Sequence, residues 1–294
     1  PATTATQIAT LKQLDAKGPR IAIWCGQTER PWGHDSIEQG GVGGSETAVI
    51  RMSGELAKLG WHVEVYGFMT PEQEGLHNGV YWYPYWRFNP QEIHDVFIGW
   101  RALSISTNAS LRYIWCHDVQ SENQWDREQY KLIDGVFVLS EAHRKNVSFL
   151  PEEKVIVTRN GLDPSFFKPL KNEPQRLIYA SCPSRGLVIL LEEWTEIKKR
   201  FPAAVLDIFY GFTPHFLEAM KRKESLRQCY ARVTALLDLP GIHFHGMVSQ
   251  DKLAAAFSKA GIFAYPCTFP EISCITAMQA QAAGAVPVTS GYWA

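Results

Sequence analysis

The sequence lacks the features that mark several classes of protein. Its 29 lysines and arginines stand against 30 aspartates and glutamates, and the net charge of -1 gives the whole chain no attraction for nucleic-acid phosphates or an anionic membrane. Its apolar runs, such as residues 187–191, are far shorter than the roughly 20 residues that span a bilayer. It has neither a low-complexity tract nor a solenoid repeat. We therefore exclude an integral membrane protein and expect no nucleic-acid partner, although a local basic patch is still open.

The cysteines and histidines show no pattern of disulfide or metal chemistry. Six cysteines are present, none in a Cys-x-x-Cys pair, and the N-terminal residues have no charged-then-apolar signal segment. Reduced thiols in a cytosol are the expected state, so we predict a cytoplasmic protein, with peripheral attachment to the inner face of a membrane left open. His243 and His245 alternate on a strand without a third ligand at zinc spacing. We expect them to pack, and we expect no metal and no cofactor.

The apolar pattern predicts the α/β class. With 294 residues, 46% of them hydrophobic, the chain can form one large or two modest cores. A strand at 21–25, a glycine-rich stretch, a helix at 45–59 and a strand at 62–67 form a βαβ opening. Further strands are predicted at 96–99, 111–116, 135–139 and 155–157. Parallel sheet is the expected arrangement.

The second half repeats this architecture after a polar stretch at 171–175. The predicted order is a strand at 176–180, a helix at 186–200, a strand at 204–210, a helix at 214–237, a strand at 242–245, a helix at 250–259 and a strand at 261–265. We therefore predict two domains, residues 1–168 and 169–294.

The glycine-rich segment from Gly40 to Glu46 lies between a strand and a helix, where bare backbone amides and the positive helix end can hold a phosphate. A dinucleotide fingerprint would need a third glycine where Glu46 stands and an acid closing the next strand. A nicotinamide site is therefore not expected. The alternative is a turn with Ser45 as the helix N-cap and nothing bound.

An arginine opens the second half in the equivalent place. Arg185 follows a strand and precedes a helix, so it could clamp a diphosphate with two parallel bonds. A solvated arginine near a helix start is the alternative. His117, which ends an apolar strand beside Asp118, places an imidazole at the carboxyl end of the first sheet, where ligands of open α/β sheets bind. A plain hydrogen-bonding histidine remains the alternative there.

The segment 266–284 is the most informative. Glu271 precedes a stretch of small residues that lets a helix N-terminus lie close to a ligand, and Gln279 falls about two turns later. A carboxylate accepts hydrogen bonds from hydroxyls and is repelled by a diphosphate, so we expect Glu271 to face a sugar or ribose. A capped amphipathic helix is the alternative. The aromatic segment 81–86 either packs or stacks on sugar rings.

Together these motifs resemble glycosyltransferase family 4, also called glycosyl transferases group 1, over Arg20 to Ser290. The loop from Gly40 to Glu46 is similar to the N-terminal loop of that family. The run Asn160-Gly161-Leu162-Asp163, followed by Phe166 or Phe167 and Pro169, resembles its interdomain signature. The run from Glu271 to Gly284, followed by Pro287-Val288, resembles its donor motif.

The resemblance implies the GT-B fold, in which two Rossmann-like domains face each other across a cleft, an acceptor-side domain first and a donor-side domain second. It implies transfer of a hexose, with retention and usually without a metal, from a nucleotide-diphosphate sugar to a hydroxyl of a glycan or lipid. A UDP- or GDP-linked donor and a role in polysaccharide biosynthesis are expected. A nucleotide-sugar hydrolase or epimerase and an inactive nucleotide-sugar-binding relative are the alternatives.

The resemblance also assigns roles to residues. Glu271 would bind donor-sugar hydroxyls, and His117 would hold a hydroxyl and the acceptor approach at the reacting sugar; these are the expected catalytic residues. Arg185 would neutralise the leaving diphosphate. The other expected donor contacts lie beside the phosphates, the base, the sugar and the ribose: Gly43, Gly44, Gly246, Met247, Val248, Ile272, Ser273, Cys274, Ile275 and Gln279.

Three features depart from the family pattern. Gln279 stands where a second glutamate usually binds the ribose, and it carries no charge. Leu190 stands five positions after Arg185, where a lysine is common. The chain stops at Ala294, soon after the donor motif, so we expect the C-terminal domain to be truncated.

Overall fold

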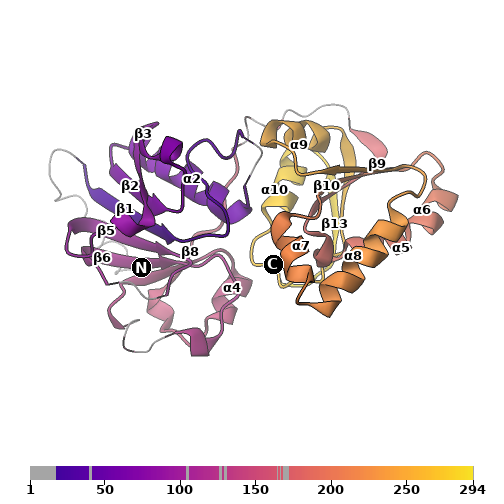
Figure 1. The fold of residues 1–294 in the computed structure, drawn as a ribbon. Helices are drawn as coiled ribbons and strands as arrows, with labels where there is room; N and C mark the ends of the chain where they lie inside the picture. The colour runs from indigo at the N-terminus through magenta and orange to yellow at the C-terminus, as the bar shows by residue number, and fades with distance from the viewer. Residues whose placement is uncertain are drawn as a thin grey trace. The chain divides into compact units, whose positions relative to one another are not determined.

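A computed structural model describes residues 18–39, 42–103, 106–125, 128, 131–163, 165, 167 and 172–293. The chain forms two compact units (Figure 1), the first comprising Pro1–Ser36 with Val42–Arg159 and the second Ile37–Gly41 with Asn160–Ala294. The boundary expected between residues 168 and 169 falls outside the described residues.

The first unit is built on an eight-stranded sheet in the order β3-β4-β2-β1-β5-β6-β7-β8. All its pairs are parallel except β3 with β4. The strands are β1 (Arg20–Gly26), β2 (His62–Gly67), β3 (Gly75–His77), β4 (Val80–Pro84), β5 (Ile93–Trp100), β6 (Asn108–Trp115), β7 (Gly135–Val138) and β8 (Val155–Val157). Among the described residues, its α-helices include α2 (Gly44–Lys58) and α4 (Glu141–Asn146). The predicted strands are confirmed, and β3 and β4 were not predicted as a pair.

The sequence allows Ser45 as the N-cap of helix α2, but the helix begins before that residue, at Gly44. Gly43 is the N-cap, in an extended conformation and with no side-chain cap, and Ser45 is the second helical residue. The helix ends close to the predicted position, at Lys58, and the amide of Gly60, a residue with φ of +88°, donates to the carbonyl of Ala57.

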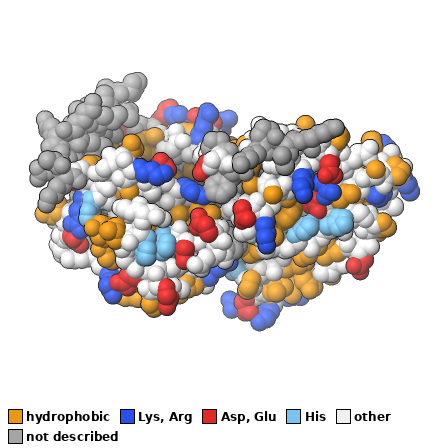
Figure 2. Space-filling view, turned by 90° about the horizontal axis from the view of Figure 1, so that it is seen from above, with side chains coloured by type: hydrophobic (Ala, Val, Ile, Leu, Met, Phe, Trp, Pro, Cys, Tyr) orange, Lys and Arg blue, Asp and Glu red, His pale blue; other side chains and the backbone are white. Residues whose placement is uncertain are grey.

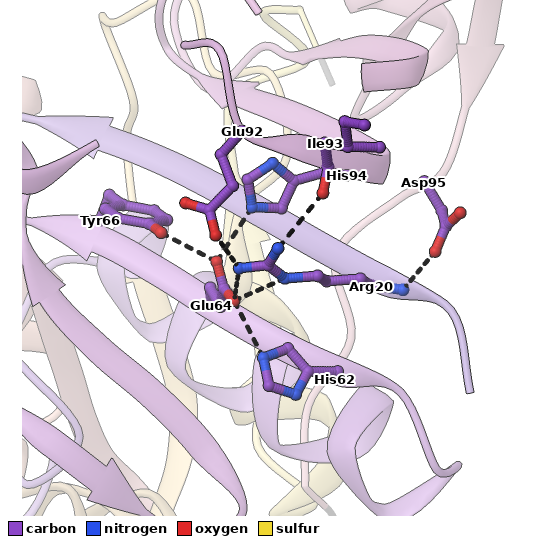
Figure 3. A network of polar contacts seen from close by, with 8 residues as sticks. All are labelled: Arg20, His62, Glu64, Tyr66, Glu92, Ile93, His94 and Asp95. Atoms are coloured by element: carbon purple, nitrogen blue, oxygen red, sulfur yellow. Dashed lines mark hydrogen bonds and ion pairs between the residues drawn. The ribbon is translucent and has the colours of Figure 1, made fainter. Parts of the chain in front are cut away.

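A buried carboxylate ties together the amino ends of the central strands of this sheet. Glu64 on β2 is 2% exposed, and it accepts hydrogen bonds from Arg20 Nε at 2.8 Å, Tyr66 Oη at 2.8 Å and His94 Nε2 at 3.0 Å. His62 Nε2 lies 2.9 Å from the same group, and Figure 3 shows the four side chains converging on it. Burial alone would raise the pKa of Glu64, but the bonds from His94, Arg20 and Tyr66 outweigh it and lower the pKa to about 2.

The second unit has a five-stranded, all-parallel sheet in the order β11-β10-β9-β12-β13. Its strands are β9 (Glu173–Ser181), β10 (Val205–Tyr210), β11 (Ile242–Gly246), β12 (Ala260–Tyr265) and β13 (Val286–Thr289). Its helices are α5 (Leu187–Glu192), α6 (Trp194–Arg200), α7 (Pro214–Met220), α8 (Glu224–Leu236), α9 (Gln250–Phe257) and α10 (Ile275–Ala282). Helices α5 to α8 contact one another in turn, and α9 contacts α10, so the two groups of helices lie apart (Figure 1).

Two predicted helices of this unit are each divided in two. The helix expected at 186–200 breaks at Glu193, and the one expected at 214–237 breaks at residues 221–223. At the second break Lys223 takes an extended backbone conformation, which interrupts the helical hydrogen-bond ladder. Three successive cations, at residues 221–223, follow the end of α7, where positive charge complements the helix dipole.

The sheet order creates a switch point between β9 and β12. These strands are neighbours, yet the segment after β9 leads to one face of the sheet and the segment after β12 leads to the other. Loops that diverge in this way leave a crevice outside the carboxyl ends of the two strands, which is where open α/β sheets bind ligands. The loops that carry Arg185 and Glu271 both begin at this point.

The surface has no single dominant charge in the view of Figure 2, where basic and acidic side chains are interspersed. His243 and His245 lie on the edge strand β11 and are both exposed, so neither is a core residue, although their rings stack on each other at 6.4 Å. His245 does stack on Phe209 at 4.5 Å and lies 2.8 Å from Asp207 Oδ1. Within the described parts of the chain, no helix is long and apolar enough to cross a membrane.

Candidate functional site

The strand register of the first unit brings two predicted groups to one edge. Trp24, Tyr66, Gly99 and Ile114 lie in neighbouring register positions near the carboxyl ends of β1, β2, β5 and β6. The start of α2 and His117 both follow strands that end on this edge. The structure therefore places Gly43, Gly44 and His117 at the carboxyl edge of the first sheet, where the sequence predicted them.

The glycine segment carries an unexpected carboxylate. The Glu46 side chain folds back against Gly43, with Oε2 so near that a Cβ on Gly43 would overlap it. Thr47 holds the same turn by donating from Oγ1 to the Gly43 carbonyl at 2.9 Å. A phosphate at the start of α2 would meet the positive helix end and would have to displace Glu46. Gly40 and Gly41 lie outside the described residues.

His117 is held in an aromatic surround. It is 8% exposed, and its ring lies 4.5 Å from that of Trp115 and 6.1 Å from that of Trp100. Burial, reinforced by the charge of Arg101 and by His143, lowers the pKa of His117 to about 3. Its Nε2 has no hydrogen-bond partner among the described residues. A neutral imidazole with an unused nitrogen suits a hydrogen bond to a ligand hydroxyl better than it suits the role of a cationic acid.

In the second unit, the loop after β9 holds Arg185 against the loop after β12. A short 3-10 turn, Pro183–Arg185, ends at Gly186, whose φ is +113°. A Cβ on Gly186 would overlap the carbonyl oxygen of Pro266, so only glycine fits both the backbone angle and the contact. The amide of Thr268 also donates to the Arg185 carbonyl at 3.4 Å.

Arg185 and Glu271 form a direct ion pair. Arg185 Nη1 lies 3.2 Å from Glu271 Oε2, and the guanidinium stacks on the Phe269 ring at 3.9 Å from its centroid. Burial disfavours the charge of Arg185, but the carboxylate of Glu271, together with Tyr265 and Cys182, outweighs burial, so the pKa of Arg185 is raised. The sequence placed these two groups at different parts of a ligand; the structure brings them into contact.

The residues after Glu271 lead into α10. Ile272 is buried, and Ser273 accepts a bond from Asn160 Nδ2 to its carbonyl at 3.5 Å. The Cys274 thiol is the N-cap of α10, accepting from the amide of Ala277 at 3.4 Å, and Ile275 is the first helical residue. The capped helix considered from sequence is therefore present, with its start beside Glu271.

The remaining predicted donor contacts of the second unit are Gln279 on α10 and the turn after β11. Gln279 Nε2 is 3.4 Å from Gln250 Oε1 on α9. Gly246 ends β11 with a φ of +67°, Met247 is partly exposed, and Val248 packs against the core. Leu190 is buried in the core of this unit, so no cation from that position reaches the loop of Arg185.

Sequence reasoning missed the side chains that hold Arg185 and Glu271. Tyr265, at the end of β12, donates to Glu271 Oε2 at 3.1 Å, and Phe269 supports Arg185. Both residues lie in segments that the sequence analysis describes. The position of Tyr265 at the carboxyl end of a predicted strand is the feature that could have identified it as a site residue.

Most of the aromatic segment 81–86 packs. Trp82 is buried, and the Tyr83 ring lies 5.4 Å from that of Tyr66. Trp86 differs, because it is 62% exposed on the short turn that follows β4. Tyr85 fixes this turn by a bond to Gln27 Oε1 at 3.3 Å. Packing therefore accounts for most of these rings and leaves Trp86 open to a ligand.

Comparison with known proteins gives structural matches only: no family model and no curated protein sequence matches the chain. Sucrose-phosphate synthase from Thermosynechococcus elongatus is 14% identical with a TM-score of 0.66, and the match covers 94% of this chain and 82% of that one. HepE from Anabaena in complex with UDP and glucose is 14% identical with a TM-score of 0.63, covering 94% and 81%. A glycosyltransferase from Rickettsia africae is 12% identical with a TM-score of 0.67, covering 94% and 80%. The chain thus has the α/β architecture of the GT-B fold that these proteins share.

Proposed function

We propose that this protein is a glycosyltransferase that moves a hexose from a nucleotide-diphosphate sugar to a hydroxyl of a glycan or lipid, with retention and without a metal. The observation that carries the proposal is the pair of Arg185 and Glu271 at the switch point between β9 and β12. An arginine and a carboxylate side by side offer one group for a diphosphate and one for sugar hydroxyls.

Arg185 stabilises the leaving group in this proposal. As the bond between the sugar and the diphosphate breaks, negative charge grows on the phosphate oxygens, and a fixed cation there lowers the barrier. The acceptor oxygen forms the new bond on the same face of the sugar, with release of the nucleoside diphosphate and a proton. Stacking on Phe269 limits the positions open to the guanidinium.

His117 and Glu271 orient hydroxyl groups. His117 is neutral near pH 7, because its pKa is lowered to about 3, so its Nε2 contributes a hydrogen bond without adding charge. Glu271 accepts hydrogen bonds from the donor sugar. Gly43, Gly44, Gly246, Met247, Val248, Ile272, Ser273, Cys274, Ile275 and Gln279 are proposed as the further donor contacts.

UDP is the first donor nucleotide to test, because HepE is described in complex with UDP and glucose, and GDP is the second. Thermal unfolding with EDTA present should show stabilisation by one of them; a ligand at 100 times its dissociation constant stabilises by about 2.7 kcal/mol. Release of that nucleotide from its sugar, with and without saccharide acceptors, then distinguishes transfer from hydrolysis. Binding without turnover would support the inactive relative, and no stabilisation by any nucleotide would refute the proposal.

A further inference from the structure

One oxygen of Glu271 has two partners of different kinds. Oε2 lies 3.2 Å from Arg185 Nη1 and accepts the Tyr265 hydroxyl at 3.1 Å. Among the described residues, Oε1 accepts no hydrogen bond. Oε1 is therefore available to accept a sugar hydroxyl, and the partners of Oε2 set the direction in which it points.

Tyr265 is held rigidly. It is 2% exposed, it pairs with Thr289 across β12 and β13, and its ring meets the Tyr179 ring edge-on at 5.7 Å. Burial raises the pKa of Tyr265, so its hydroxyl keeps its proton. Ser181 Oγ donates to the Tyr265 oxygen at 3.2 Å, which directs the tyrosine proton toward Glu271.

Arg185 is the less permanent partner. Its side chain is part-exposed, and a diphosphate carries more negative charge than one carboxylate, so an incoming diphosphate competes with Glu271 for the guanidinium. Loss of Arg185 from Oε2 would leave Tyr265 as the described residue that still fixes the carboxylate. A neutral hydroxyl can do this without competing for the phosphates.

We propose that Tyr265 is the positioning residue for Glu271: it keeps Oε1 directed at the donor sugar while Arg185 moves from Glu271 to the diphosphate. This inference rests on the proposed function. It explains why Glu271 can lie beside the diphosphate-binding arginine and still bind the sugar, since a buried neutral hydroxyl also holds Glu271 in place.

The test compares binding of a nucleoside diphosphate with binding of its sugar conjugate. Tyr265→Phe should leave the dissociation constant of UDP, or of GDP if that is the nucleotide bound, within about twofold of wild type. It should weaken the corresponding nucleotide-glucose by about tenfold, the usual effect of a lost hydrogen bond to a charged group. Tyr179→Phe is the matched control: it removes a buried hydroxyl that donates to the Cys182 carbonyl at 2.8 Å, at the start of the turn that carries Arg185, so any effect should weaken binding of the nucleotide and of its sugar conjugate equally.

Two further variants keep the result interpretable. Ser181→Ala removes only the bond that orients the tyrosine proton, and it should give a smaller loss, about two- to threefold, confined to the nucleotide sugar. In a Glu271→Ala background, Tyr265→Phe should have no additional effect on binding, because a positioning residue acts only through its target.

The outcomes are separable. Equal weakening of nucleotide and nucleotide sugar by Tyr265→Phe, or an undiminished effect in the Glu271→Ala background, would overturn the positioning role while the proposed function stands. If the wild type binds neither ligand, the proposed function fails and this inference fails with it.

Discussion

Replacing Glu64 by glutamine should destabilise the first unit by about 3 kcal/mol at neutral pH. The pKa of this carboxyl falls from 4.5 to about 2 on folding, and each pH unit corresponds to about 1.4 kcal/mol. The side chain is almost completely buried, so solvent screens its bonds very little. Glutamine has the same shape, but its amide nitrogen would face donors from Arg20, Tyr66 or His94.

The effect has a defined pH dependence. A carboxyl whose pKa is lower in the folded chain contributes its full stability above the unfolded pKa, near 4.5, and loses it as the pH falls toward about 2. The difference in unfolding free energy between wild type and Glu64→Gln should thus be constant from pH 6 to pH 8. By pH 3 its titrating part should shrink from about 3 to about 1.5 kcal/mol.

Urea unfolding of both proteins at pH 7 and pH 3, followed by tryptophan fluorescence, measures this difference. Glu92→Gln is the matched control: Glu92 pairs with the same arginine, but its side chain is 37% exposed, and such pairs contribute at most about 1 kcal/mol. A loss below 1 kcal/mol for Glu64→Gln at pH 7, or a loss that is the same at pH 3, would refute the reasoning.

Four further outcomes are expected. Arg185→Ala should weaken nucleoside-diphosphate binding at least tenfold, as measured by calorimetry. An unchanged affinity would show that Arg185 does not contact the diphosphate. Gly186→Ala should lower both the unfolding temperature and the affinity for the diphosphate. Gly54→Ala, on an open face of α2, should lower neither. The same effect from both variants would count against the contact between Gly186 and Pro266. The dependence of turnover on pH should show no inflection from His117 between pH 5 and pH 8, because the pKa of His117 is about 3. An inflection near pH 6.5 that disappears in His117→Asn would contradict this. Trp86→Ala should raise KM for a saccharide acceptor and leave the unfolding temperature unchanged; an unchanged KM would remove Trp86 from acceptor binding.

Much of the fold could be predicted because strands of a parallel sheet are buried on both faces. The runs at 21–25 and 177–180 are continuous apolar segments for that reason, and each lies in a central strand. The strand β3 could not be found in this way, because it has three residues and one of them is glycine. Its pairing depends on β4 and not on its own pattern.

The candidate site was predicted in its parts but not in its contacts. The motifs located Arg185, Glu271 and His117 at carboxyl ends of strands, since that position follows from chain order. The ion pair of Arg185 with Glu271 joins residues 86 positions apart, and its distance depends on how two loops pack. The carboxylate of Glu46 over Gly43 likewise depends on a rotamer that no spacing rule determines.

The contact between Gly186 and Pro266 has a consequence for redesign of this protein. Since the backbone of one loop lies directly against the backbone of the other, an insertion or deletion near Pro266 would shift Arg185 as well as Glu271. A loop graft meant to change the proposed sugar contact of Glu271 would therefore also alter the proposed phosphate contact of Arg185. Substitutions in either loop that keep its length leave the contact of Gly186 with Pro266 in place.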